Sequence, residues 1–219
     1  MSETTDNNFL SVKTVLIGES GVGKSSIIKQ FVVNEFDPEI NASISGQYTS
    51  KMINIMDKNL QFDLWDTAGQ EIYRSLAKLF YQDAKIIIFV YDITNPKSFE
   101  SIKKYWYKQI KANSCKDAIY ALVGNKSDMF DKERIDEEEV KKYAESIGAI
   151  FHKTSAKSNS SVEELFKIVG KQFLDPNFDY KNEECTDNKK EDIFSNDVDI
   201  GSVKLNKNIH KKKSKFRCC

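Results

Sequence analysis

The stretch Gly18-Glu19-Ser20-Gly21-Val22-Gly23-Lys24-Ser25 decides how this chain folds. It matches the pattern Gly-x-x-x-x-Gly-Lys-Ser/Thr, and it lies between a short apolar run, Val15 to Ile17, and a segment of helical spacing from Lys24 to about Val33. Its glycines let the backbone curl so that several N–H groups face one phosphate group, and the start of the helix adds positive potential. The stretch therefore predicts a strand, a phosphate-binding loop and a helix in succession.

The side chains of this loop have separate expected roles. Lys24 should bridge the β- and γ-phosphate oxygens of a nucleoside triphosphate, and the Ser25 hydroxyl should bind Mg²⁺. The side chain of Ser20 is small enough to leave room for water or an incoming arginine. A glycine-rich turn without a ligand shares the pattern, which does not choose between ATP and GTP. We assign nucleotide binding in this segment to Ser20, Gly21, Val22, Gly23, Lys24, Ser25 and Ser26.

Outside the loop, apolar runs of strand length alternate with segments of helical spacing. Strands are expected at 51–56, 60–65, 86–92, 119–123 and 149–152, and helices at 96–112, 136–147 and 160–173. The turn Asp57-Lys58-Asn59 is too short for a parallel crossover, so its two strands should be antiparallel. The alternation predicts an α/β fold, a doubly wound, six-stranded, mostly parallel sheet with one antiparallel strand and helices on both faces. Ligands of such sheets bind at the carboxyl ends of the strands.

Flanking residues indicate where three of these helices begin or end. Asn95 precedes Pro96 and is expected to cap the helix at 96–112. Gly148 should stop the helix at 136–147, and Ser160 or Ser161 should cap the last helix.

Composition places these elements in one domain with an extension. The chain has 219 residues, 40% hydrophobic and 30% charged, which is typical of soluble proteins. We expect a flexible N-terminus at 1–9, a domain at 10–175 and a disordered tail at 176–219. No apolar run approaches the roughly 20 residues that span a bilayer. The polar N-terminus lacks a secretory core and has Ser2 where myristoylation needs glycine, so the cytosol is expected.

Three further motifs follow predicted strands in a fixed order. They are Asp66-Thr67-Ala68-Gly69-Gln70, Asn125-Lys126-Ser127-Asp128 and Thr154-Ser155-Ala156-Lys157. Together with the phosphate loop, they resemble the small GTPases of the Ras superfamily over about residues 10–175. The pair Trp65-Asp66 and the terminal Cys218-Cys219 resemble the Rab branch, and the overall pattern looks loosely closest to the endosomal Rabs.

The motif Asn125-Lys126-Ser127-Asp128 indicates which base the nucleotide has. Guanine presents donors at N1 and N2, and the Asp128 carboxylate can accept from both, whereas adenine has no such donor pair. The resemblance implies that Asn125 holds the loop and the base, that the stem of Lys126 covers one ring face, and that the Ala156 N–H faces O6. It assigns nucleotide binding to Phe36, Asn125, Lys126, Asp128, Ser155, Ala156 and Lys157. Phe36 alone could equally be a core aromatic.

The resemblance also assigns hydrolysis and the metal. Asp66 matches the residue that holds Mg²⁺ through water, and the Gly69 N–H matches a donor to the γ-phosphate. Gln70 matches the residue that orients the attacking water, and Gln70 and Lys24 are the predicted catalytic residues. Ser43 stands nineteen residues after Lys24, where the family usually has threonine. Serine keeps the hydroxyl that can ligate Mg²⁺ but lacks the methyl group that restricts the side chain. A functional but looser GTP-bound switch is expected.

The implied cycle is a switch between GTP and GDP states, in which the γ-phosphate and Mg²⁺ order residues 40–48 and 67–80. No arginine of the chain is an obvious aid to hydrolysis in cis, because Arg74 would sit on the second switch and contact partners. The implied partners are an activating protein, an exchange factor, a dissociation inhibitor and effectors. Tyr48, Trp65 and Phe80 match the family's aromatic effector triad, although ordinary core packing explains three aromatics equally well. We expect a monomer without a nucleic-acid partner.

The C-terminus predicts a membrane anchor. Residues 176–203 carry three basic and eight acidic side chains, whereas residues 204–219 carry seven basic and none acidic. A basic run beside two terminal thiols suits an anionic membrane surface, and the resemblance makes Cys218 and Cys219 geranylgeranylation sites. The alternative is a solvated lysine tail. The expected location is the cytoplasmic face of an intracellular membrane, endosomal by the resemblance, with a cytosolic pool.

Three hypotheses about function follow. The leading one is a Rab-like GTPase that regulates vesicle traffic. A P-loop ATPase or nucleotide kinase is the second, and Asp128 argues against it. A GTP-binding scaffold that barely hydrolyses is the third, kept open by the altered triplet Ser43-Ile44-Ser45.

Overall fold

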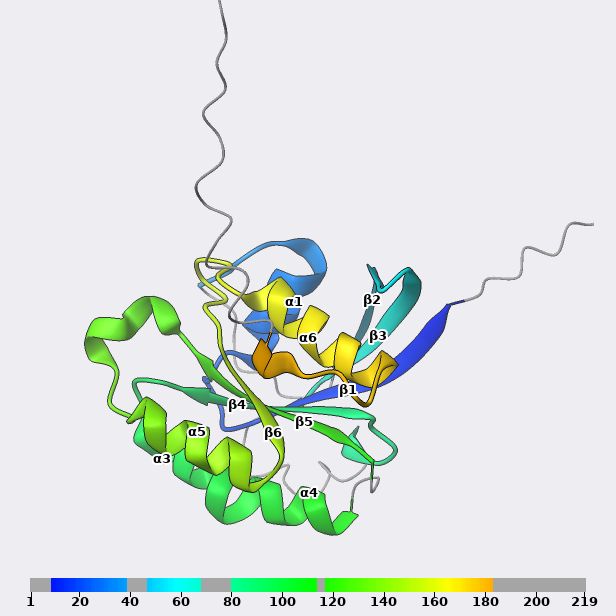
Figure 1. Ribbon diagram of the computed structural model, residues 1–219. Coiled ribbons are helices and arrows are strands. Elements are labelled where there is room, and N and C mark those ends of the chain that lie inside the picture. Colours follow the sequence, from blue (N-terminus) through cyan, green and yellow to red (C-terminus); the bar gives the residue numbers. More distant parts are fainter. Residues whose placement is uncertain (1–8, 39–46, 68–79, 114–116, 183–219) are drawn as a thin grey trace, which may run out of the picture.

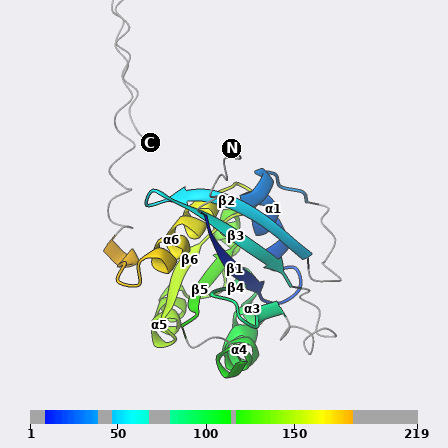
Figure 2. The same ribbon diagram turned by 90° about the vertical axis from the view of Figure 1, so that its right-hand side faces the viewer.

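A computed structural model describes residues 9–38, 47–67, 80–113 and 117–182. Its core is one six-stranded sheet in the order β2-β3-β1-β4-β5-β6, which can be followed in Figures 1 and 2. The β2–β3 pair is antiparallel and the other neighbours are parallel, so the predicted fold class is confirmed. The strands are β1 Leu10–Ile17, β2 Gln47–Ile55, β3 Lys58–Asp66, β4 Ile86–Asp92, β5 Ile119–Asn125 and β6 Ala149–Lys153.

Helices cover both faces of the sheet (Figure 1). Helices α1 Lys24–Val33 and α6 Val162–Leu174 pack their apolar residues on one face. On the other face lie α5 Glu137–Ser146 and a continuous helical run made of α3 Pro96–Ser101, a π-helical turn Ile102–Trp106 and α4 Tyr107–Asn113. Strand β4 is buried along its whole length between these layers, as expected for a central parallel strand.

Most predicted element boundaries hold within a few residues, and two local features differ. The turn between β2 and β3 is Met56-Asp57 and not Asp57-Lys58-Asn59, because Lys58 and Asn59 already pair with β2. Both turn residues have positive φ, 50° and 60°, the handedness that matches the twist of a tight hairpin. The helix predicted at 96–112 contains the π-turn, which no sequence pattern indicated.

The capping predictions are partly confirmed. The Asn95 side chain accepts a hydrogen bond from the Lys97 N–H at 3.2 Å. Ser161 does occupy the N-cap position of α6, but its backbone is left-handed and its side chain makes no capping hydrogen bond. The predicted cap position is therefore confirmed at Ser161, but this serine does not make the side-chain hydrogen bond typical of a capping serine. Glu163 and Glu164 in the first turn of α6 supply favourable negative charge instead.

The first residues of the predicted tail contact the domain. Phe178 and Tyr180 are partly buried against the core, and Lys181 pairs with Glu145 of α5 at 2.7 Å. The remaining tail and the first eight residues lie outside the described residues. None of the helices that the structure describes combines the length and the apolarity needed to cross a bilayer.

The parallel register brings the predicted motifs to one edge of the sheet. Leu16 pairs with Asp66 near the ends of β1 and β3, and Asp92 pairs with Asn125 at the ends of β4 and β5. Ile17, the last residue of β1, pairs with Phe89, so β4 and β5 extend three residues further at this same edge of the sheet. Strand β6 ends beside them at Lys153, which leads into the third motif. The carboxyl ends of five parallel strands thus surround the start of α1.

Candidate functional site

A cavity of about 370 Å³ opens at this edge of the sheet. Its walls come from the phosphate loop, the segment after α1, the end of β3 and the loops that follow β5 and β6. The residues that line it are Ser20, Gly21, Gly23, Lys24, Ser25, Ser26, Phe36, Asp37, Pro38, Thr67, Asn125, Lys126, Asp128, Met129, Ala156 and Lys157.

Two glycines of the phosphate loop are required by close contacts. A Cβ atom on Gly18 would lie 2.1 Å from the Val90 carbonyl oxygen in β4, and one on Gly23 would lie 2.2 Å from Asn125 Nδ2. Gly23 also has a φ of 97°, which side chains rarely adopt. The loop therefore packs against β4 and β5 at distances that only glycine permits.

Lys24 lies at the bottom of the loop and is buried, with 5% of its surface exposed. Its Nζ donates to the carbonyl oxygens of Gly18 at 2.9 Å and Glu19 at 3.0 Å. Burial lowers the pKa of Lys24 to about 8, although the charges of Asp66 and Glu19 oppose this shift. A cation held this way can turn toward phosphate oxygens in the cavity without moving its backbone.

Ser25 and Asp66 form the pair expected to hold the metal. The Ser25 hydroxyl donates to Asp66 Oδ2 at 2.5 Å, and Asp66 is buried at the end of β3. Thr67 extends this arrangement, because its hydroxyl donates to the Leu16 carbonyl at 2.7 Å and holds the end of β3 against β1. A hydroxyl and a carboxylate side by side offer the hard oxygen ligands that Mg²⁺ prefers, so the residues fit this ion.

Asp128 lies at the other end of the cavity, on the 3₁₀-helix Ser127–Lys132. The fully buried Ser155 donates its hydroxyl to Asp128 Oδ1 at 2.5 Å, and the same hydroxyl accepts from the Ser158 N–H at 3.1 Å. The carboxylate is therefore oriented by a neighbour that packing holds in place.

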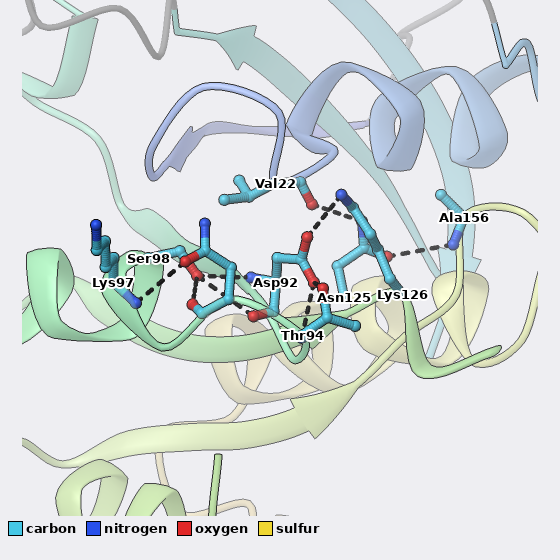
Figure 3. A network of polar contacts seen from close by, with 9 residues as sticks. Val22, Asp92, Thr94, Lys97, Ser98, Asn125, Lys126 and Ala156 are labelled. Carbon is cyan, nitrogen blue, oxygen red and sulfur yellow. Dashed lines mark hydrogen bonds and ion pairs between the residues drawn. The ribbon is translucent and has the colours of Figure 1, made fainter. Parts of the chain in front are cut away.

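Lys126 is fixed by an ion pair that the sequence analysis did not identify. Its Nζ lies 2.7 Å from Asp92 Oδ2, at the end of β4. Figure 3 shows the two side chains directed toward each other. Asp92 Oδ1 accepts from the Thr94 N–H at 2.8 Å and from its hydroxyl at 2.7 Å. Burial favours the neutral acid, but the hydrogen bonds from Lys126 and Thr94 outweigh it and lower the pKa of Asp92. Asp92 therefore stays ionised and holds the lysine stem along the cavity wall.

Asn125 links three parts of the site. Its Nδ2 donates to the Val22 carbonyl at 2.8 Å, and its Oδ1 accepts from the Ala156 N–H at 3.3 Å; both partners are drawn in Figure 3. The same Oδ1 also accepts from the Thr154 hydroxyl at 3.3 Å. The Ala156 N–H, assigned to guanine O6 by the resemblance, is thus directed at Asn125 here. One buried amide joins the phosphate loop to the loop after β6.

The structure brings together most of the predicted site residues, and some fall elsewhere. Val22 and Ser155 are buried directly behind the cavity wall, and Phe36 lines the cavity with 39% of its surface exposed. Ser43, Gly69 and Gln70 lie outside the described residues, as do Cys218 and Cys219.

The three predicted effector aromatics are adjacent. The ring centroids of Tyr48 and Trp65 are 5.3 Å apart, and those of Trp65 and Phe80 are 6.0 Å apart. Trp65 and Phe80 pack against the core, whereas Tyr48 is 55% exposed. The cluster thus contributes to packing and still presents an aromatic surface.

Sequence reasoning missed several residues of the site. Asp37, Pro38 and Met129 line the cavity, but no spacing pattern singled them out. Thr67 also lines it, and although it stands in the motif that begins at Asp66, no role was predicted for it. Asp92 could have been predicted from the sequence, because it ends a continuous apolar strand at the carboxyl edge of the sheet, where the site was expected. Its pairing with Asn125 places it within reach of Lys126.

Comparison with known proteins gives one consistent result. Residues 13–175 match the Ras family. The chain is 41% identical to Ras-related protein Rab-22A of the dog, Canis lupus familiaris, over 161 residues, which are 74% of this chain and 82% of the relative. It is 41% identical to human Ras-related protein Rab-31 over 75% of this chain and 85% of the relative. It is 38% identical to Ras-related protein Rab5A of rice over 80% of this chain and 85% of the relative.

Proposed function

This chain belongs to the Ras family as a Rab-type small GTPase, and we propose on that premise that it regulates vesicle traffic. The cavity beside Lys24 is the proposed binding site for GTP and GDP with Mg²⁺. The observation that carries the assignment of the ligand is the distribution of charge along one cavity. The buried Lys24 ammonium lies at one end, and the Asp128 carboxylate, oriented by Ser155, lies at the other. This arrangement is complementary to a triphosphate joined to guanine.

The residues of the chain divide the work of hydrolysis. Lys24 and the loop N–H groups bind the β- and γ-phosphates, Ser25 and Asp66 hold the metal with Ser43, and Gln70 orients the attacking water. When bound between these residues, Mg²⁺ would supply positive charge that stabilises the phosphate groups during hydrolysis. By the family resemblance, the Gly69 N–H would donate to the γ-phosphate, and loss of the γ-phosphate on hydrolysis would then release the second switch. Rate acceleration rests on positioning and electrostatics, and an activating protein contributes an arginine.

Substitution of Gln70 by leucine should separate binding from hydrolysis. The wild-type protein is expected to hydrolyse GTP at roughly 10⁻⁴ to 10⁻³ s⁻¹, and Gln70→Leu should be at least about tenfold slower because no side chain orients the water. Single-turnover hydrolysis of preloaded GTP measures both rates, and Gln109→Leu on the exposed side of α4 is the matched control.

Equal rates for the wild-type protein and Gln70→Leu would contradict the proposed enzyme. If both rates were near zero while GTP still bound tightly, the scaffold hypothesis would replace it.

The proposed cycle requires a membrane, exchange and activating proteins, a dissociation inhibitor and effectors. Tyr48 and its two aromatic neighbours are the proposed effector surface. We propose that Cys218 and Cys219 are prenylated and that the basic residues of 204–219 add attraction to an anionic leaflet. If residues 183–219 form a flexible chain, the domain can stand off the membrane by roughly 35 Å. The resemblance to endosomal Rabs makes an endosomal membrane the first choice.

Replacement of both Cys218 and Cys219 by serine should move the protein from the membrane fraction to the cytosol, because one basic run without a lipid binds membranes only marginally. Fractionation of eukaryotic cells that express each variant measures the distribution. Cys185→Ser, in the same predicted tail, is the control and should stay on membranes. Undiminished membrane retention of the double variant would refute the anchor.

A further inference from the structure

Glu19 of the phosphate loop makes contacts that phosphate binding does not require. Its Oε1 accepts hydrogen bonds from the Ser101 hydroxyl and from the indole Nε1 of Trp106, the latter at 3.3 Å. Ser101 ends α3 and Trp106 ends the π-turn that follows it. One carboxylate oxygen of the loop therefore joins the phosphate loop to the helical run on one face of the sheet.

The π-turn explains how both donors reach the same oxygen. The Tyr107 N–H bonds to the Ile102 carbonyl, five residues back, instead of four. In a regular α-helix, residues five positions apart point about 140° away from each other, so Ser101 and Trp106 would face different directions. A wider turn brings them toward the same side. The π-turn therefore lets Ser101 and Trp106 donate to the same oxygen of Glu19 in the phosphate loop.

Trp106 is a rigid donor. Only 2% of its surface is exposed, it belongs to the apolar cluster beneath the sheet, and its ring packs edge-on against Tyr105 at 5.0 Å. A hydrogen bond to an ionised carboxylate is stronger than one to a neutral acceptor. The position of Glu19 is thus set by the packing of a helix and not by the loop alone.

The backbone of Glu19 transmits this position to the phosphate-binding lysine. The carbonyl oxygens of Gly18 and Glu19 are the two groups that hold Lys24 Nζ. The side-chain contacts restrain the backbone of Glu19, so a shift of the loop backbone that follows their loss would move one of the two carbonyl acceptors of Lys24.

We propose that Glu19, Ser101 and Trp106 form an anchor that positions the phosphate loop and thereby slows the release of bound nucleotide. Through this anchor, a shift of α3 and the π-turn would change the position of Glu19 and thereby that of Lys24 in the nucleotide site. This inference rests on the proposed function, in which the loop holds GTP or GDP. Ser101 and Trp106 are positioning residues and do not touch the ligand themselves.

Substitutions that keep the charge of Glu19 test the anchor most directly. Trp106→Phe removes the N–H donor and keeps an aromatic ring, and Ser101→Ala removes the other donor. Each should speed the release of a fluorescent GDP analogue by about fivefold to tenfold, since a hydrogen bond to a charged group is lost and the carboxylate is left less restrained. Release is measured in excess unlabelled GDP at constant Mg²⁺, with Glu138→Gln on the exposed side of α5 as control.

A double-substitution cycle distinguishes positioning from simple stabilisation. In a Glu19→Ala background, Trp106→Phe should no longer change the release rate, because its acceptor is gone. Glu19→Gln, which keeps an acceptor, should restore part of the sensitivity. With Trp65→Phe as background, Trp106 is the single tryptophan of the chain, and its emission should shift when Glu19 becomes alanine.

The outcomes separate this inference from the proposed function. Release rates equal to wild type in Trp106→Phe and Ser101→Ala, with lowered unfolding temperatures alone, would show that the contacts only stabilise the fold. Equal acceleration by Trp106→Phe with and without Glu19 would overturn the anchor as well. If Trp106→Phe fails to fold, Ser101→Ala with Glu19→Ala carries the same cycle. Failure of the wild-type chain to bind guanine nucleotides would instead reject the proposed function.

Discussion

Asp128→Asn should reduce the preference of this protein for GTP over ATP from about 10⁴-fold or more to almost none. The carboxylate of Asp128 offers two acceptor oxygens, which match the two donors on one edge of guanine. Asparagine has the same shape but replaces one acceptor with an NH₂ donor, so it opposes a donor of guanine. Ser155 can still donate to the remaining oxygen, and the loop should keep its conformation.

Competition between labelled GDP and unlabelled GTP or ATP measures this preference. Asp131→Asn is the matched control, because Asp131 lies on the same 3₁₀-helix and does not line the cavity. An unchanged preference in Asp128→Asn would show that another residue reads the base. Tight binding of ATP by the wild-type protein would favour the alternative of an ATPase or nucleotide kinase.

Lys24→Met should weaken GTP binding by about 10³-fold, because the hydrogen bonds between a buried ammonium and the phosphate oxygens are lost in a site of low dielectric. Methionine fills a similar volume, so packing around α1 should be preserved. Equilibrium binding of a fluorescent GTP analogue measures the loss. Lys142→Met, on the exposed side of α5, should bind GTP like the wild type. Full affinity in Lys24→Met would remove the phosphate loop from the proposed site.

The pH dependence of the wild-type protein provides a second measurement on the same residue. Burial lowers the pKa of Lys24 to about 8, and phosphate oxygens beside the ammonium would favour its charged form. GTP affinity should therefore be constant below pH 8 and fall as the pH rises through 8. GTP binding above pH 8 should take up a proton, which calorimetry in buffers of different ionisation enthalpy detects.

The free energy of unfolding of the nucleotide-free protein should show the opposite trend. The pKa of Lys24 is lower in the folded chain than in the unfolded chain, so the unfolded state binds more protons between pH 8 and 10.5. Below pH 8, the charged Lys24 therefore lowers the free energy of unfolding by about 3 kcal/mol, since each unit of pKa difference corresponds to roughly 1.4 kcal/mol. This destabilisation disappears as the pH rises toward 10.5. Lys24→Met should remove the proton uptake on binding and this contribution to the pH profile.

Local patterns were sufficient for much of the fold. The run Ile86–Asp92 is continuous and apolar because both faces of β4 are covered, and the strand has the predicted bounds. Asn95 before Pro96 specified a helix start through the chemistry of a few neighbouring residues, and the structure has that cap. The predicted turn between β2 and β3 began one residue too late, and the left-handed backbone of Ser161 was not predicted, because methionine and serine rarely adopt that conformation.

By itself, the sequence determined the phosphate loop, the order of the motifs and most of the side chains that line the cavity, because each of these depends on residues close together in the chain. Only the tertiary structure decided what holds those side chains in place. Asp92 restrains Lys126, Ser155 orients Asp128, and the π-turn brings Ser101 and Trp106 to Glu19. These contacts join residues 27 to 87 positions apart, and no periodicity along the chain encodes such pairs. They form because the carboxyl ends of the parallel strands share one edge of the sheet and because the helices pack against its two faces.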